Sequence, residues 1–549
     1  MRAALPSFDR RRLAGLAGVG IVVGGLALGD RIEHRQWLAL LAAGWLLGLI
    51  GVWPGLPAEI SGTARRTVQT TIVLGSIFVL IAVQLLRTQV VLGDVIAHRA
   101  AIDPTTGAVV SNPRLAADLG TGRGRMLDRN GAVLAETIDE GDFPRRVAPD
   151  PAAAPVVGYF SPRLYGASGL EAAYDDALAG RASGNAVAQE LDRLLGRSQL
   201  GLDLHLTLDA NLQDLADREL AGRPGAAVLL DARTGAVLAL ASSPHVDPSQ
   251  LGGTDAAGTA AAQAYWATIA DDPAAPLLPR ATQGLLTPGS IFKVVTAAAA
   301  LDSGAATPDS TYEDDGQFTV QGHTIDDPNR PDPSQTTWTL TQALGWSLNA
   351  VFAQVGLQLG ADPLRDMAAR FGFGGALPFD LPTAASQLAS DAGDLGNPAT
   401  LADTAFGQGE IETTPLQMAL VAACVANDGR IMRPYLVDRA TAPDGAVAWQ
   451  TRPSVWRRPI GDPAANELAQ MMVWATTEGG NRAAAIPGYT VGGKTGTAET
   501  GRGTTHAWFI GWATDGPRAY AVAVVVEEGG SGGSVALPIA RDLLAGALG

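Results

Sequence analysis

Residues 287–300 read Thr287-Pro-Gly-Ser290-Ile-Phe-Lys293-Val-Val-Thr-Ala-Ala-Ala-Ala. Pro288 and Gly289 break the chain, so the apolar run that follows predicts a helix that begins at or near Ser290. Residues three apart share a helix face, and we expect Ser290 and Lys293 to project together. A serine at a helix start is most often only a cap. A lysine on an apolar face, however, is costly to bury unless it is paired or neutral.

Lysine occurs at only two positions, Lys293 and Lys494, and every other cation is arginine. Arginine replaces lysine at exposed positions, but its guanidinium stays protonated above roughly pH 12. It cannot stand where a side chain must lose its proton. The two lysines are therefore the first candidates for chemistry.

Lys494 lies in the segment Val491-Gly-Gly-Lys494-Thr495-Gly496-Thr497-Ala498. Closely spaced glycines weaken a strand but let another backbone approach it, so a peptide could pair with this segment. A third element, Ser347-Leu-Asn349, opens another apolar helical stretch. Ser-x-Asn alone is weak evidence, but both lysines in such settings, in this order, are hard to attribute to chance.

The composition excludes several classes of protein. The 549 residues carry 39 Lys+Arg and 55 Asp+Glu, a net charge of 39 − 55 = −16, which argues against binding nucleic acid. A single cysteine, Cys424, excludes an internal disulfide and a cysteine zinc cluster. The six histidines show no metal-ligand spacing, so we expect neither a metal nor a cofactor.

Three apolar stretches open the chain: Leu13–Gly29, Trp37–Pro54 and Thr70–Leu86. Each is close to the roughly 20 residues that span a bilayer as a helix. Cationic clusters precede the first and third stretches, and the positive-inside rule places the N-terminus in the cytoplasm. With three spans, everything after Leu86 lies outside the cell. A signal peptide or soluble core helices are weaker interpretations of three such stretches.

The remaining chain mixes strand and helix patterns. Residues 123–135 predict a hairpin about an Asn-Gly turn, residues 185–200 a helix, residues 202–208 a strand and residues 225–242 a second hairpin. Residues 290–480 are mostly helical in pattern. Three strands, 489–498, 507–513 and 519–528, and a helix at 539–548 then end the chain. Strands first and last with helices between them favour an α+β domain.

The motifs together resemble those of the penicillin-recognising serine transferases, Ser-x-x-Lys, Ser-x-Asn and Lys-Thr-Gly. Their separations are 347 − 290 = 57 and 494 − 290 = 204 residues, and the long second interval resembles the class B penicillin-binding proteins more than the compact β-lactamases. Further stretches resemble that class: residues 123–131, 166–171, 407–417 and 506–511. The run of residues 158–171 is most similar to its actinobacterial PbpA-like branch. That class commonly has one membrane anchor, and this chain departs from it with three expected spans.

The resemblance implies a membrane-anchored α+β architecture. We expect a cytoplasmic tail (1–12), three transmembrane helices (13–86), a small mixed pedestal or dimerisation-like module (87–200) and a transpeptidase domain (201–549). The last would have the serine β-lactamase-like fold, with an antiparallel sheet and a helical subdomain. The chain would lie in the cell membrane as a multi-pass protein, with the catalytic domain outside.

The same resemblance implies a peptidoglycan D,D-transpeptidase. Ser290 would attack the carbonyl of the penultimate D-alanine of a stem peptide, release the terminal D-alanine and form an acyl-enzyme. β-Lactams would inhibit the protein covalently. Lys293 would take the Ser290 proton, Ser347 would relay a proton to the leaving amine, and Asn349 would hold Lys293. The D-alanine carboxylate would be held by residues of the Lys-Thr-Gly segment: Lys494, Thr495, Gly496 and Thr497. The N–H groups of Ser290 and Thr497 would form the oxyanion hole.

Alternatives remain at this point. A class A β-lactamase places a glutamate shortly after Ser-x-Asn, and none occurs between Asn349 and Glu410. A D,D-carboxypeptidase would share every motif. A membrane-bound β-lactam sensor would need a cytoplasmic output domain, and the expected cytoplasmic pieces are short; a pure scaffold would not need both lysines. The resemblance also implies a glycan polymerase of the SEDS family as partner.

Overall fold

The computed structural model describes residues 10–53, 61–92, 101–102, 109–111, 122–140, 143–181, 201–253, 256–389, 395–501 and 503–549. The chain divides into two compact units, Met1–Ala117 and Asp118–Gly549. The helix predicted at 185–200 lies outside the described residues.

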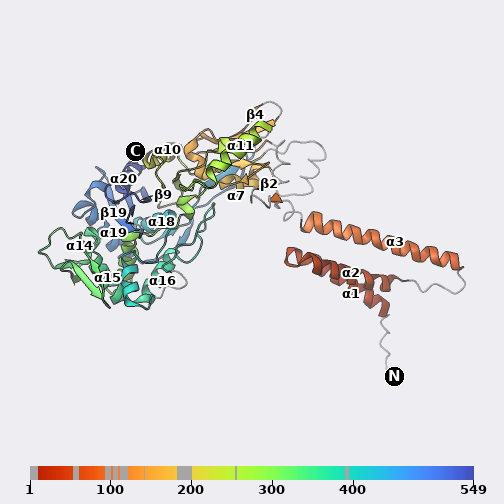
Figure 1. The fold of residues 1–549 in the computed structure, drawn as a ribbon, viewed down its shortest axis with the longest axis horizontal. Coiled ribbons are helices and arrows are strands. Elements are labelled where there is room, and N and C mark those ends of the chain that lie inside the picture. Colours follow the sequence, from red (N-terminus) through yellow and green to blue (C-terminus); the bar gives the residue numbers. More distant parts are fainter. Residues whose placement is uncertain are drawn as a thin grey trace, which may run out of the picture. The chain divides into compact units, whose positions relative to one another are not determined.

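The described part of the first unit contains three long helices where the apolar stretches predict them (Figure 1): α1 (Arg10–Ala27), α2 (His34–Val52) and α3 (Gly62–Leu86). Two segments, α2 and residues Gly62–Gln89, are long and apolar enough to cross a membrane by length and composition. Helix α1 begins with three arginines, so its apolar part is shorter than the roughly 20 residues that a span needs.

These helices contact one another closely. A Cβ atom on Gly44 of α2 would lie 2.5 Å from the Val22 side chain of α1, so glycine permits the close approach. Helix α2 donates two side-chain hydrogen bonds to α3, from Trp37 Nε1 to Gln84 Oε1 at 2.7 Å and from Trp45 Nε1 to Ser76 Oγ at 2.9 Å. These polar atoms on the apolar helices are therefore paired with one another. The short strands β1 (Ala101–Ile102) and β2 (Val109–Ser111) follow.

An antiparallel five-stranded sheet of order β10-β9-β21-β20-β19 forms the centre of the second unit. It confirms the predicted hairpin and the three C-terminal strands: β9 (Gly225–Asp231), β10 (Val237–Ser243), β19 (Thr490–Glu499), β20 (Thr505–Thr514) and β21 (Ala519–Val526). The predicted hairpin joins the C-terminal strands through β9, which lies beside β21 with Ala226 opposite Val525.

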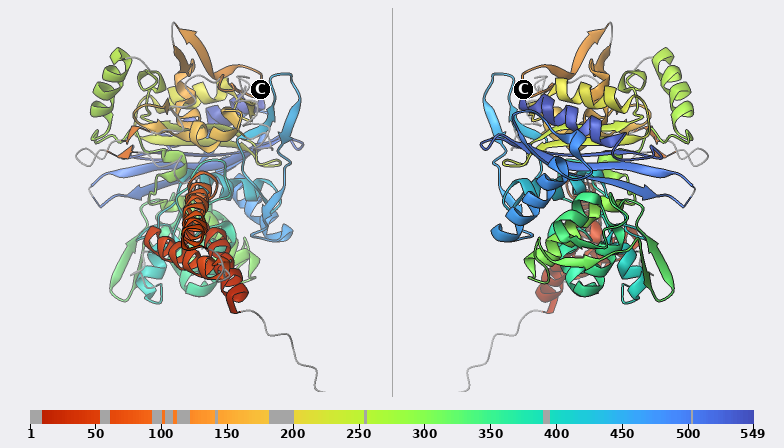
Figure 2. Two further views of the ribbon diagram at one scale, coloured as in Figure 1. Left: turned by 90° about the vertical axis from the view of Figure 1, so that its right-hand side faces the viewer. Right: turned by 90° about the vertical axis from the view of Figure 1, so that its left-hand side faces the viewer.

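Helices cover both faces of this sheet because its strands are apolar on both sides. Val522 and Val524 of β21 pack with α10 (Ala210–Leu220) and α20 (Ala536–Leu548), whereas the alternate residues face the larger core. On that side lie α13 (Lys293–Asp302), α18 (Pro415–Ala426) and α19 (Asp462–Thr477). Figure 2 shows the strands in blue between α20 and a green helical subdomain.

The helical subdomain contains four helices and two short two-stranded sheets: α14 (Leu340–Trp346), α15 (Asn349–Leu359), α16 (Ala361–Phe371), α17 (Pro398–Ala405), β11 (Thr311–Glu313), β12 (Gln317–Val320), β13 (His323–Asp326) and β14 (Thr337–Thr339). Strand β11 pairs with β14, and β12 with β13. The helical pattern predicted the helices of this region, but not the two short sheets.

A second sheet, of order β17-β16-β8-β3-β4-β5, joins segments far apart in the sequence. Its members are β3 (Met126–Leu127), β4 (Val133–Glu140), β5 (Phe143–Val147), β8 (Asp203–Leu206), β16 (Val437–Thr441) and β17 (Val447–Gln450). The predicted hairpin at 123–135 and the strand at 202–208 are confirmed. Strand β8 also pairs antiparallel with β16, a connection that the sequence did not predict.

The shorter elements of the second unit pack around these sheets: α6 (Ala154–Val157), β6 (Phe160–Ser161), β7 (Gly166–Ala167), α7 (Gly169–Ala173), α8 (Asp175–Leu178), α11 (Ala256–Ile269), α12 (Arg280–Gln283), β15 (Ile431–Met432) and β18 (Val455–Arg457). The buried carboxylate of Glu171 in α7 accepts hydrogen bonds from Arg123 Nε and Arg146 Nε, both at 2.6 Å. This ion network fixes α7 against β3–β5.

Candidate active site

A cleft of about 1120 Å³ lies between the edge strand β19 and the helical subdomain. Its lining includes five of the predicted site residues: Ser290, Ser347, Asn349, Thr495 and Thr497. Lys293 and Lys494 are fully buried beside it. The structure thus brings the three sequence motifs together, although they are separated by up to 204 residues (494 − 290 = 204).

Ser290 lies in a short 3₁₀ helix, Gly289–Phe292, and α13 starts only at Lys293. The predicted helix start was therefore nearly right, with a tighter first turn. Gly289 has a φ of +57°, and its N–H donates to the Gly407 carbonyl at 2.9 Å. A Cβ atom on Gly407, itself at φ +90°, would lie 1.9 Å from the Gly289 carbonyl oxygen. The 407–409 loop thus supports the serine turn from behind.

Lys293 is held by three acceptors in the Ser-x-Asn segment. Its Nζ donates to the Ser347 carbonyl at 2.6 Å, to Asn349 Oδ1 at 2.7 Å and to Ser347 Oγ at 3.3 Å. Burial lowers the pKa of Lys293 to about 7, while the charge of Asp327 opposes this decrease. A lysine with such a pKa is a base near neutral pH, which an exposed lysine is not.

Ser347 occupies the junction between α14 and α15. The sequence predicts that it opens a helix, but Ser347 ends α14 in a left-handed conformation with φ +65°, and α15 starts at Asn349. Such a backbone is unfavourable for a serine and persists only where the surroundings hold it. Here it turns both the carbonyl and the hydroxyl of Ser347 toward Lys293.

Lys494 reaches the same hydroxyl from the sheet. Its Nζ donates to Ser347 Oγ at 2.8 Å and to the Thr495 carbonyl at 2.8 Å. Burial, followed by the nearby charge of Lys293, lowers the pKa of Lys494 well below its ordinary value. Two buried ammonium groups that share one hydroxyl repel each other, so the pair favours having one neutral member.

Strand β19 is the edge of the five-stranded sheet, and glycine lets it approach the serine turn. A Cβ atom on Gly496 would lie 2.9 Å from the Pro288 carbonyl oxygen, and one on Gly289 would lie 3.0 Å from the Thr497 carbonyl oxygen. The outer edge of β19 faces the cleft and offers main-chain groups to an extended peptide. The close approach predicted from the glycines of this strand is therefore observed.

Sequence reasoning missed two further residues, Asn481 and Asp327. Asn481 accepts a hydrogen bond from Thr495 Oγ1 at 2.9 Å and donates from Nδ2 to the Gly493 carbonyl at 3.2 Å. Asp327 lies next to Lys293 and is buried. No local pattern marks either residue, because both reach the site through tertiary packing.

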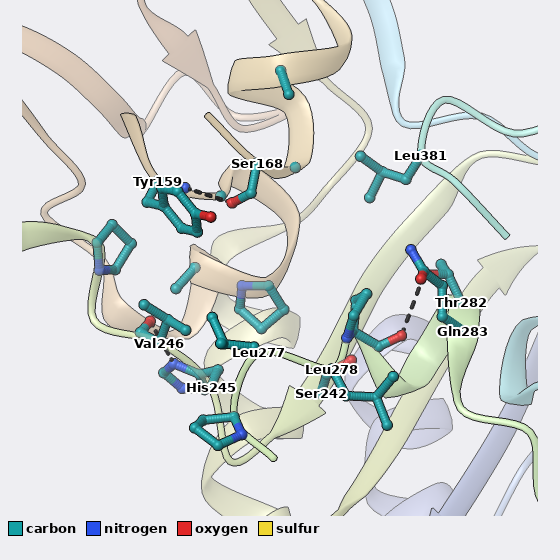
Figure 3. A pocket seen from close by; sticks show the side chains of 18 of the residues that line it. Tyr159, Ser168, Ser242, His245, Val246, Leu277, Leu278, Thr282, Gln283 and Leu381 are labelled. Atoms are coloured by element: carbon teal, nitrogen blue, oxygen red, sulfur yellow. Dashed lines mark hydrogen bonds between the residues drawn. The ribbon is translucent and has the colours of Figure 1, made fainter. Parts of the chain in front are cut away.

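A second cavity, of about 630 Å³, lies away from the lysines (Figure 3). Its lining is mostly apolar and includes Tyr159, Val246, Leu277, Leu278 and Leu381. Among the described residues, no group of three or more His, Cys, Asp or Glu side chains could hold a metal ion. The serines and lysines of the three motifs therefore lie at the first cleft and not at this cavity.

Comparison with known proteins agrees with this geometry. Residues 225–545, more than half of the chain, match the penicillin-binding protein transpeptidase domain, and residues 123–204 match the penicillin-binding protein A dimerisation domain. The chain is 37% identical over 450 residues to the peptidoglycan D,D-transpeptidase PbpA of Mycolicibacterium smegmatis, a match that covers 77% of this chain and 88% of that protein. PbpA of Mycobacterium tuberculosis is 36% identical over 446 residues, with the same coverage.

Solved structures lead to the same family. Penicillin-binding protein A from M. tuberculosis, as an imipenem acyl-enzyme complex, superposes with a TM-score of 0.72 at 34% identity and covers 79% of this chain and 100% of its own. Its penicillin G acyl-enzyme complex gives a TM-score of 0.71 at 33% identity and covers 78% of this chain and 100% of its own. Together with the cleft, in which the three sequence motifs and the two buried lysines meet, these matches show that the chain belongs to the class B penicillin-binding proteins and is a peptidoglycan D,D-transpeptidase of the PbpA type.

Proposed function

We propose that Ser290 is the nucleophile of this transpeptidase and Lys293 its base. The single observation that carries the proposal is the hydrogen-bond network in which Lys293, Ser347 and Lys494 meet beside Ser290 in one cleft. A neutral Lys293 takes the Ser290 proton as the hydroxyl attacks the carbonyl of the penultimate D-alanine. Ser347, bonded to both lysines, then passes a proton to the leaving D-alanine amine.

The remaining predicted residues bind the substrate. Asn349 fixes Lys293 through its Oδ1 atom. Lys494 and Thr495 face the position of the terminal D-alanine carboxylate, while the N–H groups of Ser290 and Thr497 stabilise the oxyanion. Gly496 keeps the strand close to the serine turn. An amine from a second stem peptide then attacks the acyl-enzyme carbonyl, forms the cross-link and releases Ser290.

Fluorescent penicillin labelling of membranes tests the assignment. Wild-type protein should label, whereas Ser290→Ala and Lys293→Arg should not. Ser303→Ala is a matched control, because Ser303 follows α13 and its hydroxyl donates to carbonyls of that helix, at Ala299 and Ala300. Labelling of Ser290→Ala at the wild-type level would refute the nucleophile. Release of D-alanine with and without an added amine acceptor then measures transfer against the carboxypeptidase reaction.

We further propose that the chain is a multi-pass membrane protein in which α2 and α3 span the bilayer and α1, although its apolar part is short, crosses it packed against α2. The hydrogen bonds between α2 and α3 and the close contact of α1 with α2 support this arrangement. Since Cys424 is buried and is the single cysteine, introduced cysteines report topology. Glu33→Cys, between α1 and α2, should react with an impermeant thiol reagent in intact cells, and Ser61→Cys, before α3, should not. The reverse pattern would refute the topology.

This proposal keeps the division made from the sequence: a tail (1–12), membrane spans (13–86), a pedestal (87–200) and a catalytic domain (201–549). It also includes a SEDS-family polymerase as the partner. The match of residues 123–204 to a dimerisation domain supports the pedestal. Co-purification with the polymerase encoded in the same genome, with and without residues 10–53, tests the partner. Loss of the polymerase only from the shortened chain would support a role of α1 and α2.

A further inference from the structure

A histidine and an aspartate form a second pair of proton-exchanging groups in the catalytic cleft. His323, the first residue of β13, has its Nε2 atom 3.0 Å from Oδ1 of Asp403 in α17. Both side chains line the cleft that contains Ser290, and both are partly exposed, to 45% and 26%. The acylation step uses neither residue.

The hydrogen bond between them determines which imidazole nitrogen is free. An ionised carboxylate only accepts hydrogen bonds, so the neutral ring of His323 donates its Nε2–H to Asp403 and keeps its lone pair on Nδ1. The carboxylate also stabilises the imidazolium that forms when Nδ1 takes a proton. The pair is therefore built as a base whose proton acceptor is Nδ1.

Asp403 is linked to the turn that carries the nucleophile. Its carbonyl accepts the Gln408 N–H at 2.9 Å, and the neighbouring Gly407 carbonyl accepts the Gly289 N–H at 2.9 Å. Gly289 directly precedes Ser290. Main-chain hydrogen bonds thus join the aspartate to the serine turn through the loop that follows α17.

His323 is linked in the same way to the residue that holds Lys293. Strand β13 runs from His323 to Asp326, and the carbonyl of Asp326 accepts a hydrogen bond from Asn349 Nδ2 at 3.4 Å. Three steps along a strand cover about 10 Å, so the imidazole lies near the catalytic residues but outside the hydrogen-bond network of the two lysines. The histidine and Asp403 belong to the helical-subdomain wall of the cleft, and β19 forms the other wall.

The charge of the cleft suits a cationic substrate group. Its lining includes the carboxylates of Asp326 and Asp403 on one wall and of Glu499 on the other, and no lysine or arginine is among the described residues that line it. Lys293 and Lys494 are fully buried beside it. An ammonium group that enters the cleft therefore meets carboxylates on both walls.

The transfer reaction has one proton more to remove than acylation has. In acylation, the Ser290 proton passes to the leaving D-alanine amine, and the lysines end as they began. An alkylamine acceptor has an ordinary pKa of about 10.4, so it arrives as an ammonium group and loses two protons when it becomes an amide. One of these protons returns to Ser290. Without a further base the other proton would stay on Lys293 or Lys494, which are both fully buried.

We propose that His323 is the base that removes a proton from the acceptor amine and that Asp403 positions it. The inference rests on the proposed acyl-enzyme at Ser290. Nδ1 of His323 takes one proton from the acceptor ammonium group, and the neutral amine attacks the acyl carbonyl. The new C–N bond forms, the ester bond to Ser290 breaks, and the second proton returns to the serine oxygen through Lys293 and Ser347. The partly exposed imidazolium then releases its proton to water.

Two partial reactions separate this role from a structural one. Acylation by a penicillin needs no acceptor amine, so His323→Gln should keep the wild-type acylation rate. Transfer of a D-Ala-D-Ala peptide to an alkylamine acceptor should fall roughly 10²-fold relative to hydrolysis of the same acyl-enzyme. Glutamine can still donate a hydrogen bond to Asp403, but it has no nitrogen that takes up a proton. Mass spectrometry of the two products, formed by the full-length protein in detergent, gives the ratio of transfer to hydrolysis.

The basicity of the acceptor provides a second readout. Hydroxylamine is a weaker base than an alkylamine and is already neutral at pH 7, so it has one proton fewer to lose. His323→Gln should therefore transfer the acyl group to hydroxylamine at the wild-type rate. Asp403→Asn should show the same selective loss with the alkylamine, because its amide can donate to Nε2 and move the imidazole proton to Nδ1.

A matched control pair lies at the second cavity. His245, which is labelled in Figure 3, has its Nε2 atom 3.1 Å from Oδ1 of Asp217. His245→Gln removes an imidazole–carboxylate pair of similar length outside the cleft, and the ratio of transfer to hydrolysis should stay at the wild-type value. Thermal melting checks that each variant is folded, and Asp403→Asn keeps the test decisive if His323→Gln does not fold.

A loss of transfer to the alkylamine, with acylation and transfer to hydroxylamine retained, would support the proposal. Equal losses of acylation and transfer, an unchanged ratio in His323→Gln, or an equal defect with hydroxylamine would refute His323 as the base. Penicillin labelling of Ser290→Ala would instead refute the nucleophile. Failure of the inference is in this way distinguished from failure of the proposed function.

Discussion

The Nζ atom of Lys494 lies 2.8 Å from the hydroxyl oxygen of Ser347. The same hydroxyl accepts a longer bond of 3.3 Å from Lys293. The two lysines are thus linked through the hydroxyl group of Ser347. This hydroxyl can accept a hydrogen bond from one lysine and donate its own proton to the other if that other lysine is neutral. This arrangement makes the two lysines chemically unequal.

Arginine at each lysine position should have different effects. Lys293→Arg should lower the acylation rate roughly 10²–10⁴-fold, because a guanidinium does not act as a base at neutral pH. Lys494→Arg keeps a cation at the position that we propose faces the substrate carboxylate, and we expect it to retain more activity with a weaker apparent affinity for the penicillin. Stopped-flow measurement of acylation against penicillin concentration separates the rate from the affinity. Equal losses in both variants would contradict unequal roles.

Gly407→Ala should abolish acylation while leaving much of the fold intact. The added Cβ atom would lie 1.9 Å from the Gly289 carbonyl oxygen and would displace the turn that carries Ser290. Gly374→Ala is the control, because Gly374 has a similar φ of +87° and nothing within 4 Å of a Cβ atom. In both variants the free energy of unfolding should fall by about 1–2 kcal/mol, because alanine is unfavourable at a positive φ. Penicillin labelling that persists in Gly407→Ala would show that the loop does not support the serine.

Glu171→Gln should lower the free energy of unfolding by about 3–5 kcal/mol, because it removes the charge that two buried arginines share. Burial alone would raise the pKa of Glu171, but Arg146 and Arg123 outweigh it and hold this pKa below its ordinary value. The ionised form therefore stabilises the fold above the unfolded pKa of about 4.3, and this contribution is lost as the pH falls through the folded pKa. Thermal melting at pH 7 and at lower pH should show the difference between wild type and variant shrinking with acid. A constant difference would contradict this linkage.

Asn481→Ala should weaken recognition of the substrate carboxylate without removing the nucleophile. Asn481 accepts the Thr495 hydroxyl proton and donates to the buried Gly493 carbonyl, which would lose its partner at a cost of about 1–3 kcal/mol. We expect a higher KM for a D-Ala-D-Ala peptide and a smaller change in kcat. A fall in kcat at constant KM would place Asn481 in the chemical steps instead.

The three sequence motifs could be recognised as candidate site residues because each is local. Ser290 and Lys293 share one turn, and the scarcity of lysine marks Lys293 and Lys494 in the printed sequence. Asp327 could not be found in this way: among 55 acidic residues, only the hairpin β12–β13 and the packing of α15 determine that it is buried. The left-handed turn at Ser347 was also missed, because the apolar pattern continues across the break between α14 and α15.

The five-stranded sheet was largely predictable and the six-stranded sheet was not. Strands β9, β10, β20 and β21 are mostly apolar, with Gly, Asp and Pro in the links between them, and β19 is marked by its closely spaced glycines. Strand β3 is only two residues long and pairs in parallel with β8 across a long stretch of intervening chain. No local pattern encodes such a partner, because the pairing depends on the burial of both segments in one core.

The six-stranded sheet has a mechanical consequence. Strands β3, β8 and β16 are consecutive neighbours, so main-chain hydrogen bonds run without interruption from residues near 126 to residues near 440. A force applied to strands β3–β5 is therefore transmitted through main-chain hydrogen bonds to β8 and β16. Strands β3–β5 and the transpeptidase domain should therefore move together, so that tension in the cell wall would act on both at once.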